Sequence, residues 1–378
     1  MIILVVLLIA GFHSNAQVDY PTFKSRTEIN PSDSGRLSFN LYNLNYVTDE
    51  EWFGNIPLSG TLFGYELIPE IEYQISPRLY IKAGIYLQKT YGRTEYTTLV
   101  PTYQVKYKAK KSEYIMGNLE GNDNHGYIEP IYNYRLIITE RQENGFQMLV
   151  DTKNYTHDLF INWRVAIVPG DDFKEQFDIG YASKLKFLTK GKLNLDVPIQ
   201  FLYSHKGGQY DVLNTPLSSL TNTALGTSLT YHVDHKLFQK IVFENYYVNY
   251  KDISGQKLQP FKQGNAFYSH LLFQLKNVGI DFRYFDGEGY IGPRGGALFQ
   301  SVSAKYPGLV EKHRELLIAS FIYDKEIYKN VNFDFRFLPY KDFIEKISSG
   351  TGLEYSFEMY LKYTLKANIA KFKNSLQF

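Results

Sequence analysis

Alternation of apolar and polar residues is the feature that most constrains the fold of this chain. Between Glu70 and Gln88, apolar residues occupy every second position on both sides of a short Ser-Pro-Arg turn, and the positions between them are mostly polar or charged. Successive side chains of a β-strand point to opposite faces, so this stretch predicts a hairpin with one apolar and one polar face. A protein core and a lipid bilayer would both accept the apolar face.

The same alternation recurs along the chain, and the segments between the alternating stretches differ in length in a regular way. The predicted strands include residues 61–75, 156–168, 176–188, 193–204, 224–233, 267–275, 278–285, 331–338 and 353–365. Short turns such as 76–78, 189–192, 234–236 and 276–277 are interspersed with long polar segments at 48–60, 205–221, 251–264, 286–313 and 339–351. Long strands with short turns on one side and long loops on the other are typical of transmembrane barrels. The apolar face is therefore expected to lie against lipid.

The amino-terminal residues predict export. An apolar run over residues 2–10 is followed by Ser14-Asn15-Ala16, which fits a signal-peptide cleavage site after Ala16. The apolar run is too short for a membrane-spanning helix, which needs about 20 residues. The mature chain is expected to begin near Gln17.

Together with the abundant aromatic residues, the absence of cysteine and the terminal Phe378, these features resemble bacterial outer-membrane β-barrel proteins of the porin-like kind. The resemblance implies an all-β transmembrane antiparallel barrel in the outer membrane, with short periplasmic turns and long extracellular loops. We expect a signal peptide at 1–16, a periplasmic segment at 17–34, the barrel at 35–366 and a tail or closing segment at 367–378.

The number of strands depends on residues 92–154. One inward strand and a large extracellular excursion there would give 14 strands, which we favour. Three strands near 102–117, 128–140 and 145–152 would give 16.

The polar faces carry charges of both signs that are expected to line the lumen. The candidates are Glu66, Glu70, Glu72, Lys82, Arg164, Asp178, Lys184, Lys186, Asp196, Asp281, Arg283, Asp334, Arg336, Glu354, Glu358 and Lys362. The first expectation is a channel for passive diffusion of small solutes, with a weakly selective lumen that is either open or blocked. The alternative is a non-enzymatic barrel subunit of a larger outer-membrane complex for protein assembly, secretion or nutrient uptake.

Partners follow from this location and from the charge. Outer-membrane lipid and lipopolysaccharide are expected to surround the barrel, with other outer-membrane proteins or lipoproteins as candidate partners. A formal net charge of +2 gives no reason to expect nucleic acid.

The remaining motifs do not predict a cofactor, a metal or a catalytic site. Gly287–Gly292 matches G-x-G-x-x-G, but Pro293 follows where a helix would have to begin, so a flexible loop is expected. Residues 120–126, EGNDNHG, are rich in oxygen ligands without a calcium-loop spacing and predict a surface loop. No histidine pairs with a serine or an acid by local spacing, so the chain is expected not to be an enzyme.

Overall fold

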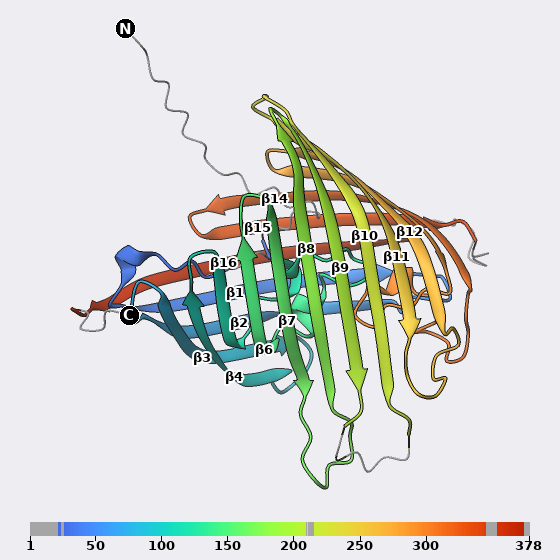
Figure 1. The fold of residues 1–378 in the computed structure, drawn as a ribbon, viewed down its shortest axis with the longest axis horizontal. Helices are drawn as coiled ribbons and strands as arrows, with labels where there is room; N and C mark the ends of the chain where they lie inside the picture. Colours follow the sequence, from blue (N-terminus) through green and yellow to red (C-terminus); the bar gives the residue numbers. More distant parts are fainter. Residues whose placement is uncertain (1–21, 24–25, 209, 211–214, 345–353, 374–378) are drawn as a thin grey trace.

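The computed structural model describes residues 22–23, 26–208, 210, 215–344 and 354–373, and in these residues the chain forms a closed antiparallel β-barrel (Figure 1). Each strand pairs with the next along the chain, and the first strand, β1, pairs with the last, β16. The predicted signal peptide and Phe378 lie outside the described residues. None of the described helices is long and apolar enough to cross a membrane.

The barrel has sixteen strands in the described residues. They are β1 (Arg36–Glu51), β2 (Gly60–Gln74), β3 (Leu79–Thr90), β4 (Thr98–Lys108), β5 (Ser112–Asn118), β6 (Asn144–Asp151), β7 (Tyr155–Val165), β8 (Gln176–Lys190), β9 (Leu193–Lys206), β10 (Ser218–His232), β11 (Phe238–Asp252), β12 (Gln263–Leu275), β13 (Val278–Glu288), β14 (His313–Tyr328), β15 (Val331–Asp342) and β16 (Glu354–Lys371). The short helices are η1 (Pro31–Asp33), η2 (Asn122–His125), α1 (Leu136–Thr139) and η3 (Ala297–Phe299).

The alternation predicted from sequence sets the two faces of the barrel wall. In β2 and β3, Ile71 and Ile85 are exposed on the outside, whereas Glu70 and Glu72 are buried on the inside. Neighbouring strands keep this arrangement because their register places residues of the same face side by side, as with Ile71 and Ala83. The apolar face is thus the outer wall, and the all-β antiparallel barrel is confirmed.

The preferred count of 14 strands is wrong, and the barrel has the alternative number of 16. Residues 92–154 contain β4, β5 and β6, but residues 128–140 form no strand. Their apolar residues are buried inside the barrel, which accounts for their resemblance to a strand in the sequence. At the other end of the chain, β16 continues past residue 366 to Lys371 and pairs with the start of β1.

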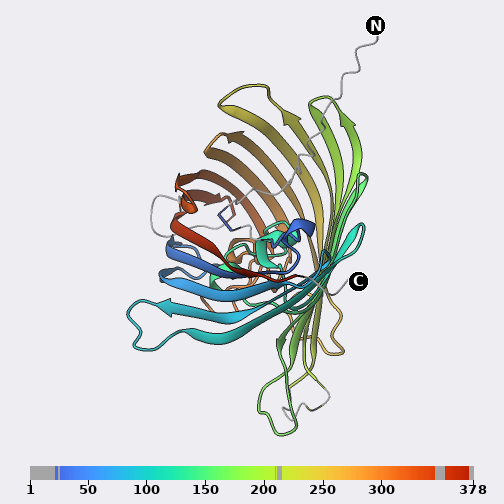
Figure 2. The same cartoon turned by 90° about the vertical axis from the view of Figure 1, so that its left-hand side faces the viewer.

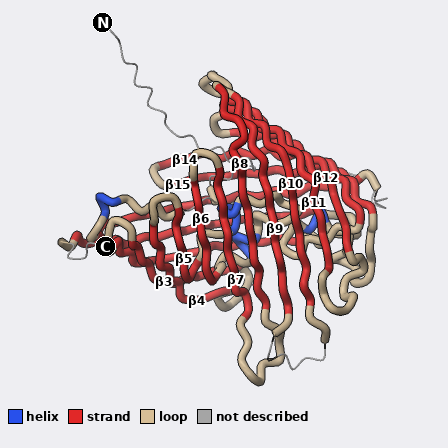
Figure 3. Tube along the Cα trace, viewed as in Figure 1, coloured by secondary structure: helices blue, strands red, loops and turns tan. Residues whose placement is uncertain are grey.

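The two ends of the barrel differ in the length of the connections between strands. Short turns at 75–78, 109–111, 152–154, 191–192, 233–237, 276–277 and 329–330 lie at one end, called here the tight-turn end. The connections at the other end, called the long-loop end, are longer, and those at 119–143 and 289–312 contain the helices η2, α1 and η3. Figures 2 and 3 show these helices within the ring of strands.

Candidate functional site

Much of the lumen is occupied by the connection between β5 and β6, residues 119–143, which we call the plug. Its buried side chains Tyr127, Ile131 and Tyr132 pack in one cluster with wall residues that include Phe160 and Leu202. The loop at 289–312 covers the plug, and a Cβ on Gly295 would collide with the carbonyl of Pro130. The G-x-G-x-x-G stretch belongs to this packing, since Tyr290 is fully buried, so the expected flexible loop is absent.

Ion pairs join the plug to the wall on several sides. Arg141 lies 2.8 Å from Glu66 of β2, and Arg135 lies 3.2 Å from Glu358 of β16. Glu129 pairs with Arg283 of β13. Because a buried charge is costly unless it is paired, these contacts favour the plug in one position within the lumen.

The histidine of the EGNDNHG stretch lies at the centre of one such contact. Nδ1 of His125 is 2.9 Å from Asp158 of β7, and Nε2 is 2.9 Å from Glu143 of the plug. Burial lowers the pKa of His125, but the two carboxylates raise it by more, to about 9. Burial also raises the pKa of Glu143, and the adjacent His125 lowers it below its usual value. The stretch is therefore an ionic contact inside the barrel and not the expected surface loop.

This contact predicts a loss of stability at alkaline pH. A histidine has a pKa of about 6.5 in an unfolded chain, so protonation of His125 stabilises the fold fully below that pH. The stabilisation, at most about 3 kcal/mol, is lost as the pH rises through the folded value of about 9. Thermal unfolding of the detergent-solubilised protein and of His125→Gln should differ most at about pH 6 and least at about pH 10. A difference that does not change with pH would contradict this assignment.

The structure places the sixteen charges named from sequence on the inner side of the wall, but they do not form one site. Asp334 and Arg336 pair at 2.7 Å, and Arg283 and Asp281 at 2.9 Å. Arg164 lies 3.0 Å from Glu140 of the plug. Others, such as Lys186 with Asp151 at 3.1 Å, pair near the tight-turn end. Both signs are mixed around the lumen.

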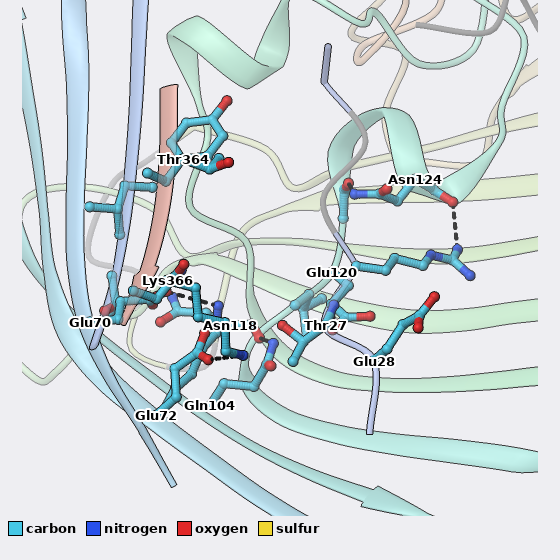
Figure 4. A pocket seen from close by; sticks show the side chains of 18 of the residues that line it. Thr27, Glu28, Glu70, Glu72, Gln104, Asn118, Glu120, Asn124, Thr364 and Lys366 are labelled. Carbon is cyan, nitrogen blue, oxygen red and sulfur yellow. Dashed lines mark hydrogen bonds and ion pairs between the residues drawn. The ribbon is translucent and has the colours of Figure 1, made fainter. Parts of the chain in front are cut away.

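A cavity of about 650 Å³ remains between the plug, the segment at 26–33 that precedes β1, and the wall formed by β1–β4 and β16 (Figure 4). Its charged groups are largely paired across it or along the wall: Lys82 lies 3.1 Å from Glu70, and Lys366 lies 2.6 Å from Glu72. Amides and hydroxyls such as Asn118 supply much of the remaining lining. Such a cavity is suited to a small polar solute but selects no sign of charge. Within the described residues no group of three or more histidine or acidic residues could hold a metal ion.

A different kind of site lies on the outer wall at the long-loop end. Ser219 is the second residue of β10 and faces His205 of β9 directly, with its Oγ 2.8 Å from Nδ1 of the imidazole. The hydroxyl of Tyr203 lies 3.2 Å from both Ser219 Oγ and His205 Nδ1. A serine within hydrogen-bonding reach of a histidine is the minimal arrangement for an activated nucleophile.

Aromatic rings extend from this pair along one row of the outer wall. Strand register places Trp163 of β7 beside Phe177 of β8, and Phe177 beside His205. The ring centroids of Trp163 and Phe177 are 5.2 Å apart, and those of Phe177 and His205 are 5.0 Å apart. On this side the serine–histidine pair therefore borders an apolar, aromatic surface.

A second serine–histidine pair with the same local geometry lies on the outer wall towards the tight-turn end. Ser183 Oγ is 2.8 Å from Nδ1 of His157, and the Tyr181 hydroxyl is 3.0 Å from the same nitrogen. Tyr155 and Tyr181 flank that imidazole. The two pairs differ in their position along the barrel axis, which makes the second a natural control for the first.

Sequence reasoning missed both pairs because it considered local spacing. His205 and Ser219 are separated by the long connection at 207–217 and meet only through the register of β9 and β10. The available signal was weak: both residues fall within the segment 205–221 that was predicted to be a loop, with His205 directly after the predicted strand 193–204.

Comparison with known families assigns the chain. A family model described as lipid A 3'-O-deacylase-type matches residues 29–372, which include all sixteen strands up to Lys371. The chain belongs to this family. A search of curated proteins finds no match.

Solved structures with a similar fold are outer-membrane proteins. OprD from Pseudomonas aeruginosa has a TM-score of 0.52 at 11% identity, over 87% of this chain and 94% of that chain. A form of Vibrio cholerae OmpT lacking loop L8 has a TM-score of 0.52 at 9% identity, over 88% of this chain and 100% of that chain. These similarities concern the fold alone. They confirm that this chain has the fold of outer-membrane barrels.

The expectation that the chain is not an enzyme is wrong. The family that matches almost the whole chain is described by an enzymatic activity. The amino-acid pattern of the strands carries no trace of that activity, because alternation reports only which side chains face lipid.

Proposed function

We propose that this protein is an outer-membrane esterase that removes ester-linked acyl chains from a glycolipid of the lipid A type. The observation that carries the proposal is the contact of 2.8 Å between Ser219 Oγ and His205 Nδ1 on the outer wall. Membership of the lipid A 3'-O-deacylase-type family supports the substrate class. A site on the outer wall is open to a lipid from the side of the membrane, whereas the lumen contains the plug.

The residues around this pair suit acyl transfer. His205 takes the proton of Ser219 as the Oγ attacks the ester carbonyl, and the tetrahedral intermediate then expels the sugar hydroxyl, which receives that proton from His205. Water, with His205 as base, hydrolyses the acyl-serine, so a free fatty acid leaves and Ser219 is regenerated. The hydroxyl of Tyr203, 3.2 Å from Ser219 Oγ, is placed to donate a hydrogen bond to the developing oxyanion.

The position of the pair also suits an amphiphilic substrate. Trp163 and Phe177 provide an apolar surface for an acyl chain, and the ends of β9 and β10 place the serine at the rim of the outer wall. We propose that the long-loop end faces outward, as expected from the sequence, so that the pair meets the lipopolysaccharide leaflet.

The direct test uses the purified protein in detergent micelles with lipid A as substrate. Mass spectrometry should show loss of the mass of one acyl chain from lipid A and release of the matching fatty acid. Lipid A that stays intact in the presence of folded protein would contradict the proposed activity. Folding is checked separately by the change in gel mobility on boiling.

Passage of small solutes through the lumen is a second candidate function. The cavity of about 650 Å³ beside the plug favours it, because its lining is polar and carries both signs of charge. The ion pairs that join the plug to several wall strands oppose free diffusion. We therefore propose at most a narrow or gated passage in the intact protein.

A further inference from the structure

We propose that a polar groove on the outer wall, across β10–β13 at the long-loop end, binds the phosphorylated sugar headgroup of the glycolipid whose acyl ester Ser219 attacks. The inference rests on the proposed esterase activity and adds to it the place and chemistry of substrate recognition. The groove encloses about 600 Å³. Its lining includes Thr221, Thr223, Asn249, Lys251, Asn265 and Lys312.

The groove interrupts the apolar outer wall. Further along the same strands the outward-facing positions hold large apolar residues, such as Leu225 of β10, Phe243 of β11 and Phe267 of β12, each more than 40% exposed. At the long-loop end the same faces change to Thr221 and Thr223, to Asn249, and to Asn265. Polar groups on the lipid-facing side of a barrel are costly at mid-membrane depth and tolerated near the interface. The change therefore marks the depth at which headgroups lie.

Strand register connects the groove to the serine. Thr221 follows Ser219 by two residues on the same face, roughly 7 Å along the strand. Thr221 lies beside Lys251, and Lys251 beside Gln263. In the next row, Thr223 lies beside Asn249, and Asn249 beside Asn265. The groove thus begins at Thr221, the next outward-facing residue of β10 after Ser219.

The charges of the groove suit an anionic group. The side chain of Lys251 is exposed, and the described residues contain no ion-pair partner for it. Lys312, with 67% of its side chain exposed, pairs with Glu288 at 2.5 Å. Exposed ion pairs contribute little to stability, so Lys312 can leave Glu288 and pair with a bound phosphate at a small cost in free energy. Two ammonium groups at one rim provide the point charges that phosphate recognition uses.

The uncharged lining suits a sugar. Hydroxyl groups of Thr221 and Thr223 and the amides of Asn249 and Asn265 offer both donors and acceptors. Tyr247 and Phe261 also line the groove and provide apolar surface beside these groups. Ser219 therefore has the aromatic row of Trp163 and Phe177 on one side and a polar, cationic groove on the other. This division matches a molecule with an acyl chain on one side of an ester and a phosphorylated sugar on the other.

The test measures binding without turnover, on the full-length Ser219→Ala protein in detergent. The probes are bisphosphorylated lipid A, the same lipid after removal of its phosphates, and inorganic phosphate. Lys251→Ala in this background should weaken binding of bisphosphorylated lipid A by about tenfold and leave binding of the dephosphorylated lipid nearly unchanged. Lys276→Ala, which removes the same charge at a tight turn between β12 and β13, is the matched control and should have no effect.

Two other outcomes of this binding experiment would overturn the inference. Equal affinities of the Lys251→Ala and Lys276→Ala proteins for bisphosphorylated lipid A would exclude the groove as its headgroup site. Displacement of the lipid by millimolar inorganic phosphate would mean that the groove binds free phosphate and not a headgroup.

The inference and the proposed activity fail in different ways. If Lys251→Ala weakens lipid A binding but the wild-type protein releases no acyl chain, the groove is supported and the esterase is not. If acyl release depends on Ser219 while Lys251→Ala leaves KM unchanged, the esterase is supported and the groove is not.

Discussion

Replacement of Ser219 by alanine is expected to reduce the rate of acyl release from lipid A by roughly 10³-fold or more. The reason is that the substitution removes the atom that forms the acyl intermediate and leaves His205 without a nucleophile to activate. Because the side chain lies on the outer wall and is only partly buried, its loss should leave the barrel folded. Initial rates of fatty-acid release, measured by mass spectrometry at equal concentrations of folded protein, test this expectation.

Ser183→Ala is the matched control for that measurement. It removes the same hydroxyl from the same kind of contact, 2.8 Å from a histidine Nδ1 with a tyrosine hydroxyl nearby, but towards the tight-turn end of the barrel. Its activity should equal that of the wild type. If Ser183→Ala loses activity and Ser219→Ala keeps it, the catalytic serine is Ser183 and our proposal names the wrong pair. If both variants are fully active, neither serine is the nucleophile.

The barrel itself could be predicted from sequence because one physical signal repeats in every long strand. Period-two alternation, long strands and short turns each report the same arrangement of a wall between lipid and an aqueous interior. The hairpin of β2 and β3 is the clearest case, since its predicted faces and turn agree with the register in which Glu72 lies beside Lys82. The strand count failed where the signal is short: β5 has only seven residues.

The plug could not be predicted, because its apolar residues, such as Ile131 and Ile137, resemble a strand in the sequence and its polar residues resemble a surface loop. EGNDNHG is a polar stretch, and burial of such a stretch is favourable only if partners of opposite charge surround it. Other plug residues meet the wall through contacts between distant parts of the chain: Arg141 meets Glu66 and Tyr134 meets Glu358, at separations of 75 and 224 residues. Only a closed barrel brings them together.

The serine–histidine pair was less predictable than the barrel and more predictable than the plug. The predicted strands stopped at residue 204 and began again at 224, whereas β9 and β10 extend far enough to include His205 and Ser219, and register across the connection between them decides whether they meet. A shift of two residues would leave both facing lipid and would break the contact. In our proposal, activity is carried by side chains at the rim, where the wall changes from apolar to polar.

Removal of the plug is expected to convert the barrel into an open channel with a conductance at least several-fold above that of the intact protein. Asn118 and Asn144 already pair at the ends of β5 and β6, so residues 119–143 can be replaced by an Asn-Gly turn without moving either strand. A barrel of sixteen strands is wide enough for an aqueous channel. The wall charges that lose plug partners, such as Glu66 and Glu358, then face water and are solvated.

Single-channel recordings in planar bilayers measure this effect. A variant shortened within the exposed loop at 92–96, between β3 and β4, is the control and should conduct like the intact protein. If the plug-free barrel is folded and conducts no better than the control, other segments close the lumen. If the intact protein already gives large, stable steps, the plug does not obstruct it, and solute passage gains support as a second activity. Acyl release should survive removal of the plug in either case, because Ser219, His205 and the polar groove all lie on the outer wall.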